Sequence, residues 1–263
     1  MSLLDRLRTN IEDITTFGPQ FLLRHLPRVT GAEMAPVHIP GVGIIYLRAG
    51  ESDVAGVRQI FGSREYDIGV PVKAAGLRIN ARYRAILEGG RKPVIVDAGA
   101  NIGAAALWFR KKYPDAAVVA VEPDPGNVRV LKCNLTGRHD MIVLAAAIGA
   151  RSGFVEVKKE KDRLNWASRT TRAESGVPVV TMTDAFAKVA NGVPFIVKID
   201  IEGFESDLFS TNVGWLNDVY MVIIEPHDWM LPGMKSSRSF QVAMGQHDFD
   251  IFVLGENLIY VRD

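Results

Sequence analysis

The chain lacks several features that would place it in particular classes of protein. Its 263 residues include one cysteine, Cys133, so an internal disulfide is excluded. The first residues carry Asp5, Arg6 and Arg8 and contain no apolar run long enough for a signal peptide or a membrane span. The formal net charge is only +1, so no global field attracts nucleic acid or a membrane surface. These absences predict a cytoplasmic protein with no nucleic-acid partner and no integral membrane association.

The most informative pattern that is present lies in residues 94–127. Residues 94–96 are a β-branched run typical of a buried strand, 97–103 form a turn of small residues, and 104–113 have apolar residues at helical spacing. A second strand follows and ends at Glu122. An acid at the end of the second strand of a βαβ unit can accept hydrogen bonds from both ribose hydroxyls of a nucleoside. The pattern therefore predicts a site for a nucleoside-containing cofactor.

The turn in this unit indicates which cofactor is bound. A dinucleotide site requires G-x-G-x-x-G, so that the backbone can approach a pyrophosphate at the helix N-terminus. This chain has Gly99 and Gly103 with no glycine between them, and Asn101 lies in the turn. That arrangement suits a cofactor with an amino-acid tail and no phosphate, such as S-adenosyl-L-methionine, and Asp97 can act on the ammonium of its methionine part. The alternative is a glycine-containing turn that binds no ligand.

From residue 93 onward, strand and helix patterns alternate, which favours an α/β fold with helices on both faces of a parallel sheet. Strands are expected at 94–97, 118–122, 141–145, 195–200 and 220–225. The tail, residues 249–263, has two strand-like runs around a turn and predicts a closing antiparallel hairpin.

The upstream part of the chain has a different pattern. It predicts helices within 1–33, a pair of strands over 36–50 and a short helix over 53–61. Residues 21–28 are amphipathic, and we expect them to pack on the catalytic domain rather than on a membrane or a partner. Residues 1–80 are expected to form an N-terminal helical and β-hairpin extension packed on the core, and residues 81–263 the domain that binds S-adenosyl-L-methionine.

Five segments, in order along the chain, match the motifs of one family. They are DAGANIG with VEPDPGN in 97–127, AIG at 147–149, VTMTDAF at 180–186, KIDIEGFESDLF at 198–209 and IIEPHDW at 223–229. Together they resemble the FkbM-type methyltransferases, a branch of the class I enzymes that use S-adenosyl-L-methionine. The resemblance covers residues 93–229, and more loosely 52–68. It implies a Rossmann-like, doubly wound, mostly parallel seven-stranded sheet with a C-terminal antiparallel hairpin.

The same resemblance implies the reaction and the residues that hold the cofactor. The expected reaction is methyl transfer to a small-molecule acceptor, with a hydroxyl oxygen of a sugar, glycolipid or natural product as the leading interpretation. The expected cofactor-binding residues are Asp97, Ala98, Gly99, Asn101, Gly103, Glu122, Pro123, Asn127, Ala147, Ile148 and Asp200.

Catalytic residues are expected where the fourth and fifth strands end. Lys198, Asp200 and Glu202 are spaced by two and share one face or the tip of an extended strand. His227 is the leading general base because imidazole titrates near neutrality, with Asp200 and Glu202 as rivals. The alternative for Lys198 is an ion pair that only closes the strand. Two further acids, at 205 and 207, are expected in the first turn of the next helix, where they complement its dipole.

The same strand ends leave a metal-assisted mechanism open. Asp200, Glu202, Glu225 and His227 offer oxygen and imidazole ligands that could hold Mg²⁺ or another divalent ion. Lys198 would repel such an ion, so the leading interpretation assigns no metal.

Acceptor recognition is expected outside the core motifs. The expected acceptor-binding residues are Tyr66, Trp166, Glu225 and Trp229. The basic connection 160–177 is either a lid over the acceptor or an ordinary loop, and Tyr66 has packing between the N-terminal part and the core as its alternative. A homo-oligomer is possible on this evidence. A nicotinamide-dependent oxidoreductase, a nucleic-acid methyltransferase and a non-catalytic S-adenosylmethionine-binding subunit are the alternatives from other classes.

Overall fold

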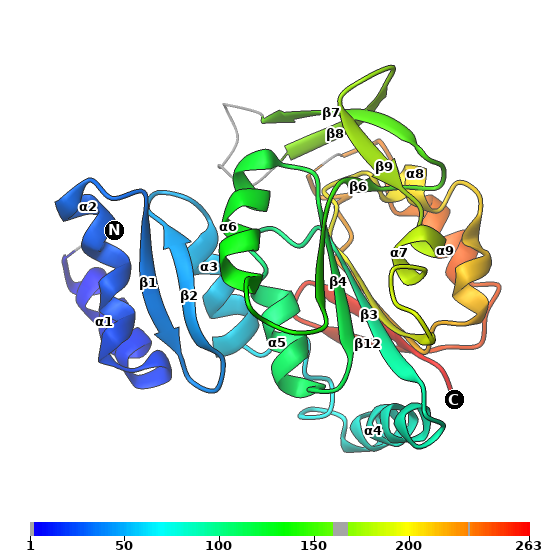
Figure 1. Cartoon of the computed structure of the whole chain (residues 1–263), viewed down its shortest axis with the longest axis horizontal. Coiled ribbons are helices and arrows are strands. Elements are labelled where there is room, and N and C mark those ends of the chain that lie inside the picture. The colour runs from blue at the N-terminus through cyan, green and yellow to red at the C-terminus, as the bar shows by residue number, and fades with distance from the viewer. Residues whose placement is uncertain (1–2, 160–167, 231) are drawn as a thin grey trace.

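A seven-stranded sheet forms the centre of the computed structural model, which describes residues 3–159, 168–230 and 232–263 (Figure 1). Its strands run in the order β12-β13-β11-β10-β3-β4-β5. Their bounds are β3 Lys92–Ala98, β4 Ala117–Glu122, β5 Met141–Ala145, β10 Gly192–Ile199, β11 Met221–Ile224, β12 Asp250–Leu254 and β13 Asn257–Val261. The pairs from β11 through β5 are parallel, whereas β13 is antiparallel to both β11 and β12. The parallel sheet and its terminal antiparallel hairpin confirm the fold class expected from the sequence.

Helices cover both faces of this sheet because its strands are apolar on both sides. In β3, Val94 and Val96 belong to one buried cluster and Ile95 to the other. The face that carries Ile95 is covered by α5 (Ala104–Lys112) and α6 (Pro125–Leu135). On the opposite face lie α7 (Met182–Phe186), α8 (Glu205–Leu208) and α9 (Arg238–Met244), as Figure 1 shows, and η3 (Val213–Asn217) belongs to the same buried cluster. Continuous apolar strands of this kind are typical of parallel sheets buried on both faces.

The N-terminal region packs beside α5 and α6. It consists of α1 (Leu3–Phe17), η1 (Pro19–His25), α2 (Leu26–Thr30), β1 (Met34–Ile39), β2 (Gly43–Arg48), α3 (Asp53–Val57) and the π-helical η2 (Arg58–Gly62). The expected strand pair is the antiparallel β1–β2 hairpin. It is fastened to α6 because the Asn134 side chain accepts a hydrogen bond from the Tyr46 backbone N–H at 2.7 Å. Phe21 is fully buried, so the amphipathic segment does pack on the rest of the chain.

Helix α4 (Lys73–Glu88) was not expected and contains the proposed boundary between residues 80 and 81. It contacts β3, and its Ile79 belongs to the same buried cluster as Phe21 and Ile95. One continuous apolar cluster therefore joins the N-terminal region to the central sheet. Within the described ranges, no helix is both long and apolar enough to cross a membrane.

A second sheet of four strands corrects the expectation for residues 160–177. Its order is β6 (Ala147–Ile148), β9 (Val177–Val180), β7 (Gly153–Lys159) and β8 (Ser168–Ala173). Strand β8 pairs antiparallel with β7, so residues 168–173 are not a loop. Their Ser, Thr and Arg residues lack the apolar alternation that identifies a strand, and the pairing with β7 decides their structure. Residues 160–167, including Trp166, lie outside the described residues.

Candidate active site

Glu122 lies at the end of β4 and its carboxylate is committed to the adjoining turn. It is 5% exposed, and its oxygens accept hydrogen bonds from the Asn101 N–H at 2.8 Å, the Asp124 N–H at 2.9 Å and the Asn127 side chain at 3.2 Å. Burial raises the pKa of Glu122, and these three donors offset part of that rise. Asn101 has a φ of 48°, which aims its N–H at the acid. The expected cofactor residues Glu122, Asn101 and Asn127 are thus brought together.

The two glycines of the turn are required by protein packing. Gly99 has a φ of +77°, and a Cβ there would lie 1.7 Å from the carbonyl oxygen of Asp200. Gly103 has a φ of +87°, and its Cβ would lie 2.7 Å from a methyl carbon of Leu131. The sequence pattern predicts that both glycines bind the cofactor. The structure adds that Gly99 brings the turn into direct contact with the end of β10.

Lys198 and Asp97 form a buried ion pair beneath this contact. The Lys198 Nζ lies 3.4 Å from Asp97 Oδ1, donates to the Gly99 carbonyl at 2.8 Å and donates to Asp200 Oδ2 at 3.2 Å. Burial lowers the pKa of Lys198, but Asp200 and Asp97 outweigh it and hold the pKa well above its ordinary value. Burial raises the pKa of Asp97, and Lys198 offsets part of that rise. Lys198 is therefore an ammonium ion that joins the first and fourth strands.

His227 lies between three carboxylates and is 3% exposed. Its Nδ1 is 2.8 Å from Glu205 Oε1, and its Nε2 is 3.5 Å from Asp200 Oδ1 and 3.7 Å from Glu225 Oε1. Glu205 was expected only to complement a helix dipole. It does begin α8, but it is 1% exposed and holds the imidazole instead. The signal in the sequence that could have indicated this role is the position of Glu205, a carboxylate six residues after the end of β10.

The cluster keeps His227 protonated in the free protein. Burial lowers the pKa of His227, but the hydrogen bonds to Asp200 and Glu205 outweigh it and raise the pKa to about 10. Burial and the charge of Asp200 raise the pKa of Glu225 to about 7. Burial also raises the pKa of Asp200, but Lys198 and His227 outweigh it, so that this pKa is depressed. His227 can accept a proton only after the charges around it change, which qualifies its expected role as the base.

The four groups expected for a divalent metal do not all converge. Ligand atoms of Asp200, Glu225 and His227 lie within 4.8 Å of one another and could hold an ion. Glu202 is not part of that group. It lies in the turn after β10 with a φ of 51°, a left-handed conformation that redirects the chain between Asp200 and α8.

The expected acceptor residues lie in different surroundings. Tyr66 is 7% exposed and stacks on Phe109 with ring centroids 5.7 Å apart, so the packing alternative describes its contacts. Burial raises its pKa. Trp229 is 67% exposed, two residues beyond His227. The expected cofactor residues Ala147 and Ile148 are buried in the small sheet, directly after Ala146, whose N–H donates to the Glu122 carbonyl at 3.1 Å.

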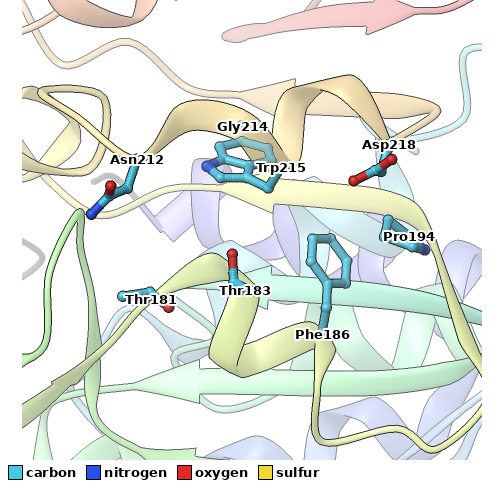
Figure 2. Close-up of a pocket in the computed structure, with 8 residues that line it drawn as sticks. All are labelled: Thr181, Thr183, Phe186, Pro194, Asn212, Gly214, Trp215 and Asp218. Carbon is cyan, nitrogen blue, oxygen red and sulfur yellow. The ribbon is translucent and has the colours of Figure 1, made fainter.

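A separate hollow of about 520 Å³ lies between α7 and η3 (Figure 2). Phe186 and Trp215 line it together with polar side chains, among them Thr183 and Asn212. None of the charged residues around His227 contributes to its lining. The hollow is therefore distinct from the charged cluster.

The strand order and the acid at the end of β4 define a Rossmann-like protein of the nucleoside-binding class. The sequence profile of the Methyltransferase FkbM domain matches residues 97–240, more than half of the chain. The chain belongs to the FkbM methyltransferase family, whose members use S-adenosyl-L-methionine. The family expected from the five motifs is thereby confirmed.

Other known proteins are similar over shorter or more divergent stretches. A segment of 43 residues is 54% identical to the methyltransferase sdnD of Sordaria araneosa, and it spans 16% of this chain and 17% of that protein. A methyltransferase of Podospora anserina solved with S-adenosylhomocysteine bound is 8% identical, with 71% of this chain and 78% of that chain covered and a TM-score of 0.40. Aeropyrum pernix fibrillarin, solved with S-adenosyl-L-methionine, is 11% identical, with 65% of each chain covered and a TM-score of 0.37.

Proposed function

We propose that the protein transfers the methyl group of S-adenosyl-L-methionine to a hydroxyl oxygen of a small-molecule acceptor of the sugar, glycolipid or natural-product class. The observation that carries the proposal is the buried His227, held by Glu205 and directed at Asp200 and Glu225. Asp200 is in turn joined to the cofactor turn, through its backbone contact with Gly99 and through Lys198. A proton-accepting group next to the methyl donor is what an alcohol acceptor requires.

The residues at the turn fit the cofactor. Asp97 is fully buried, and the Lys198 Nζ lies 3.4 Å from its Oδ1, longer than an ordinary charge-assisted hydrogen bond. The ammonium of a methionine moiety would supply donors to this carboxylate. Glu122 lies across the turn at the end of β4, where it would accept hydrogen bonds from ribose hydroxyls. When bound, the cofactor supplies a methyl carbon made electrophilic by positive sulfur.

The protein has to remove the proton of the acceptor and align its oxygen with that methyl carbon. Glu205 fixes the imidazole so that Nε2 of His227 is directed at Asp200 and Glu225. A positive charge brought near this cluster lowers the pKa of His227 and favours the neutral, proton-accepting imidazole. Asp200 is a weaker rival, because its depressed pKa makes it a poor base. Glu225 is a stronger rival, since its pKa of about 7 lies near neutral pH.

We propose that Tyr66, Glu225 and Trp229 contact the acceptor. Trp166, the fourth expected residue, lies outside the described residues. Trp229 offers an exposed indole two residues beyond His227, and such a ring can stack on the apolar face of a sugar or a polyketide.

The test is a screen with S-adenosyl-L-methionine labelled in its methyl group. The purified protein is incubated with alcohol acceptors and cell extracts, and products are identified by mass spectrometry. We expect S-adenosylhomocysteine to bind, NAD not to bind, and the label to appear as an O-methyl group. Absence of S-adenosylhomocysteine binding would overturn the proposal. Binding without any labelled product would favour a non-catalytic cofactor-binding subunit.

Metal-assisted O-methylation is the second candidate, and one observation favours it. The ligand atoms of Asp200, Glu225 and His227 converge within 4.8 Å, from a carboxylate–imidazole set that divalent ions accept. Lys198 argues against a bound metal ion, because its ammonium lies 3.2 Å from Asp200 Oδ2 and would repel a cation held by that carboxylate. Turnover that is abolished by a chelator and restored by Mg²⁺ or Mn²⁺ would establish this candidate, whereas unchanged turnover in chelator would remove it.

A further inference from the structure

Helix α1 is attached to the rest of the protein through polar groups. Asp13 is 3% exposed and pairs with two arginines, Arg24 of η1 and Arg58 of η2. The Asn10 side chain accepts a hydrogen bond from Arg24 at 2.6 Å. Phe17, at the end of the helix, stacks on Phe21 with centroids 4.4 Å apart. An amphipathic helix on a globular protein ordinarily turns its apolar stripe toward the core, and α1 does not.

The apolar side chains of α1 face solvent. We call Leu4, Leu7, Ile11 and Ile14 the α1 stripe; they are 77%, 51%, 63% and 36% exposed. Leu23, Leu26 and Val29 of the adjoining η1 and α2 are also exposed, at 40%, 41% and 85%. Seven of the seventeen exposed large apolar side chains in the described residues thus come from three consecutive helices, which lie at one end of the molecule in Figure 1. A concentration of this kind marks an interaction surface.

The spacing of the stripe indicates that its partner is another helix. Its members are separated by three, four and three residues, which is the a/d repeat of a coiled-coil seam. A membrane is a poorer match. The charged residues of α1 are Asp5, Arg6, Arg8, Glu12 and Asp13, so the helix has no net positive charge to attract anionic lipid.

The charges beside the stripe indicate that the partner helix is a second α1. Arg8 and Glu12 form an exposed pair along one edge of the stripe, with side chains 84% and 62% exposed. In an antiparallel arrangement the same edges of two identical helices lie together in opposite directions. With the stripe at the a and d positions, Arg8 then lies near both Glu12 and Arg8 of the partner subunit, and the acid offsets the repulsion between the two arginines. A parallel arrangement would place this edge against the opposite edge of the other helix, which carries Asn10.

We propose that α1 is a self-association surface, through which two copies of this chain pair antiparallel by their α1 stripes. The pairing buries the apolar side chains that the fold leaves in solvent, and it satisfies the two-fold symmetry of an isologous interface. Helix α1 lies at the end of the molecule away from α8, which carries Glu205 of the charged cluster (Figure 1), so the proposal is independent of the reaction.

The test measures the mass of the full chain in solution by light scattering and sedimentation equilibrium. We expect wild-type protein to have twice the chain mass of 28.9 kDa. Leu7→Glu and Ile11→Glu should raise the dimer dissociation constant at least about tenfold, since each places a charge in the seam. Leu77→Glu is the matched control, because Leu77 lies on helix α4 and is 58% exposed, and this variant should remain dimeric. All variants should keep the circular dichroism spectrum and the S-adenosylhomocysteine affinity of the wild type.

A charge exchange tests the antiparallel direction. Arg8→Glu alone should weaken the dimer, and Arg8→Glu combined with Glu12→Arg should restore it, because each copy again meets an opposite charge. Wild-type protein that remains monomeric at about 100 µM, roughly a hundredfold above a micromolar dissociation constant, would overturn the proposal. So would dimers that survive both stripe variants. Binding of monomeric wild type to phosphatidylcholine–phosphatidylglycerol vesicles, lost in Ile11→Glu, would also overturn it and assign the surface to a membrane.

Discussion

Glu205 Oε1 accepts a hydrogen bond from Nδ1 of His227 at 2.8 Å, and the two side chains are 1% and 3% exposed. The contact joins the first turn of α8 to the segment that follows β11. Because one imidazole nitrogen is held by this carboxylate, the other is directed at Asp200 and Glu225. A base oriented by a buried carboxylate is a recurring catalytic arrangement.

Replacing Glu205 with Gln should lower the pKa of His227 from its value of about 10, because the protonated imidazole loses a buried negative partner. If neutral His227 is the base, the rising limb of turnover against pH should move to lower pH. The measurement is the pH profile of kcat/KM together with an NMR titration of the imidazole. Asp207→Asn is the matched control, since Asp207 lies in the same short helix but pairs with Arg172. A profile that moves equally in both variants would contradict the assignment.

Replacing His227 with Ala should lower turnover by about 10²- to 10⁴-fold, the usual contribution of a general base. Affinity for S-adenosylhomocysteine should stay near that of the wild type. His247→Ala is the control, because His247 packs on the ring of Phe249. Turnover retained in His227→Ala would transfer the role to Glu225 or Asp200, and comparison with Glu225→Gln would separate these two.

Replacing Glu122 with Ala should weaken binding of S-adenosylhomocysteine by about 1 to 3 kcal/mol, as charge-assisted hydrogen bonds to ribose are lost. The same change leaves the N–H groups of Asn101 and Asp124 without their acceptor, so the melting temperature should also fall. Calorimetric titration at a temperature where the variant is folded separates the two effects. Unchanged affinity would remove the ribose assignment.

Replacing Lys198 with Met should destabilise the protein by about 3 to 5 kcal/mol near neutral pH, since Asp97 and Asp200 lose their buried cation. The folded-state pKa of Lys198 is raised, so its contribution is present below the unfolded-state pKa and is lost as pH rises through the folded one. The difference in free energy of unfolding between the wild type and the variant should therefore become smaller in alkaline solution. Urea denaturation measures it, with Lys92→Met as the control, because the Lys92–Asp140 pair is solvent-exposed. Equal decreases in the free energy of unfolding in Lys198→Met and Lys92→Met would contradict the prediction.

Replacing Gly99 with Ala should destabilise the fold far more than replacing Gly137 with Ala. Both glycines have positive φ, +77° and +73°, so both variants incur a backbone penalty of about 1 to 2 kcal/mol. Only at Gly99 does the new Cβ meet another atom, the Asp200 carbonyl oxygen at 1.7 Å, whereas nothing lies within 4 Å at Gly137. Free energies of unfolding from denaturant titration give the difference. Similar values would mean that β10 and the turn separate easily.

Much of the fold could be predicted because its signals are local. Residues 141–145 match β5 at both ends, and the expected strands at 94–97, 118–122, 195–200 and 220–225 are β3, β4, β10 and β11 with shifted ends. These runs are rich in β-branched residues and are bounded by turn residues, so the sequence alone indicates where the strands lie. Strand β8 was missed because Ser168–Ala173 is polar and becomes a strand only through its pairing with β7.

By itself, the sequence determined the class of the sheet, the acid at the end of its second strand, the family and the positions of charged residues at strand ends. Tertiary structure alone decided which of those charges meet. Lys198 reaches a carbonyl 99 residues away, Glu205 reaches a histidine 22 residues away, and Glu202 is not among the three residues whose possible ligand atoms converge. Tertiary structure also turned the α1 stripe outward, because the ion pairs of Asp13 orient the helix. Local spacing encodes elements, whereas contacts between distant segments depend on how those elements pack.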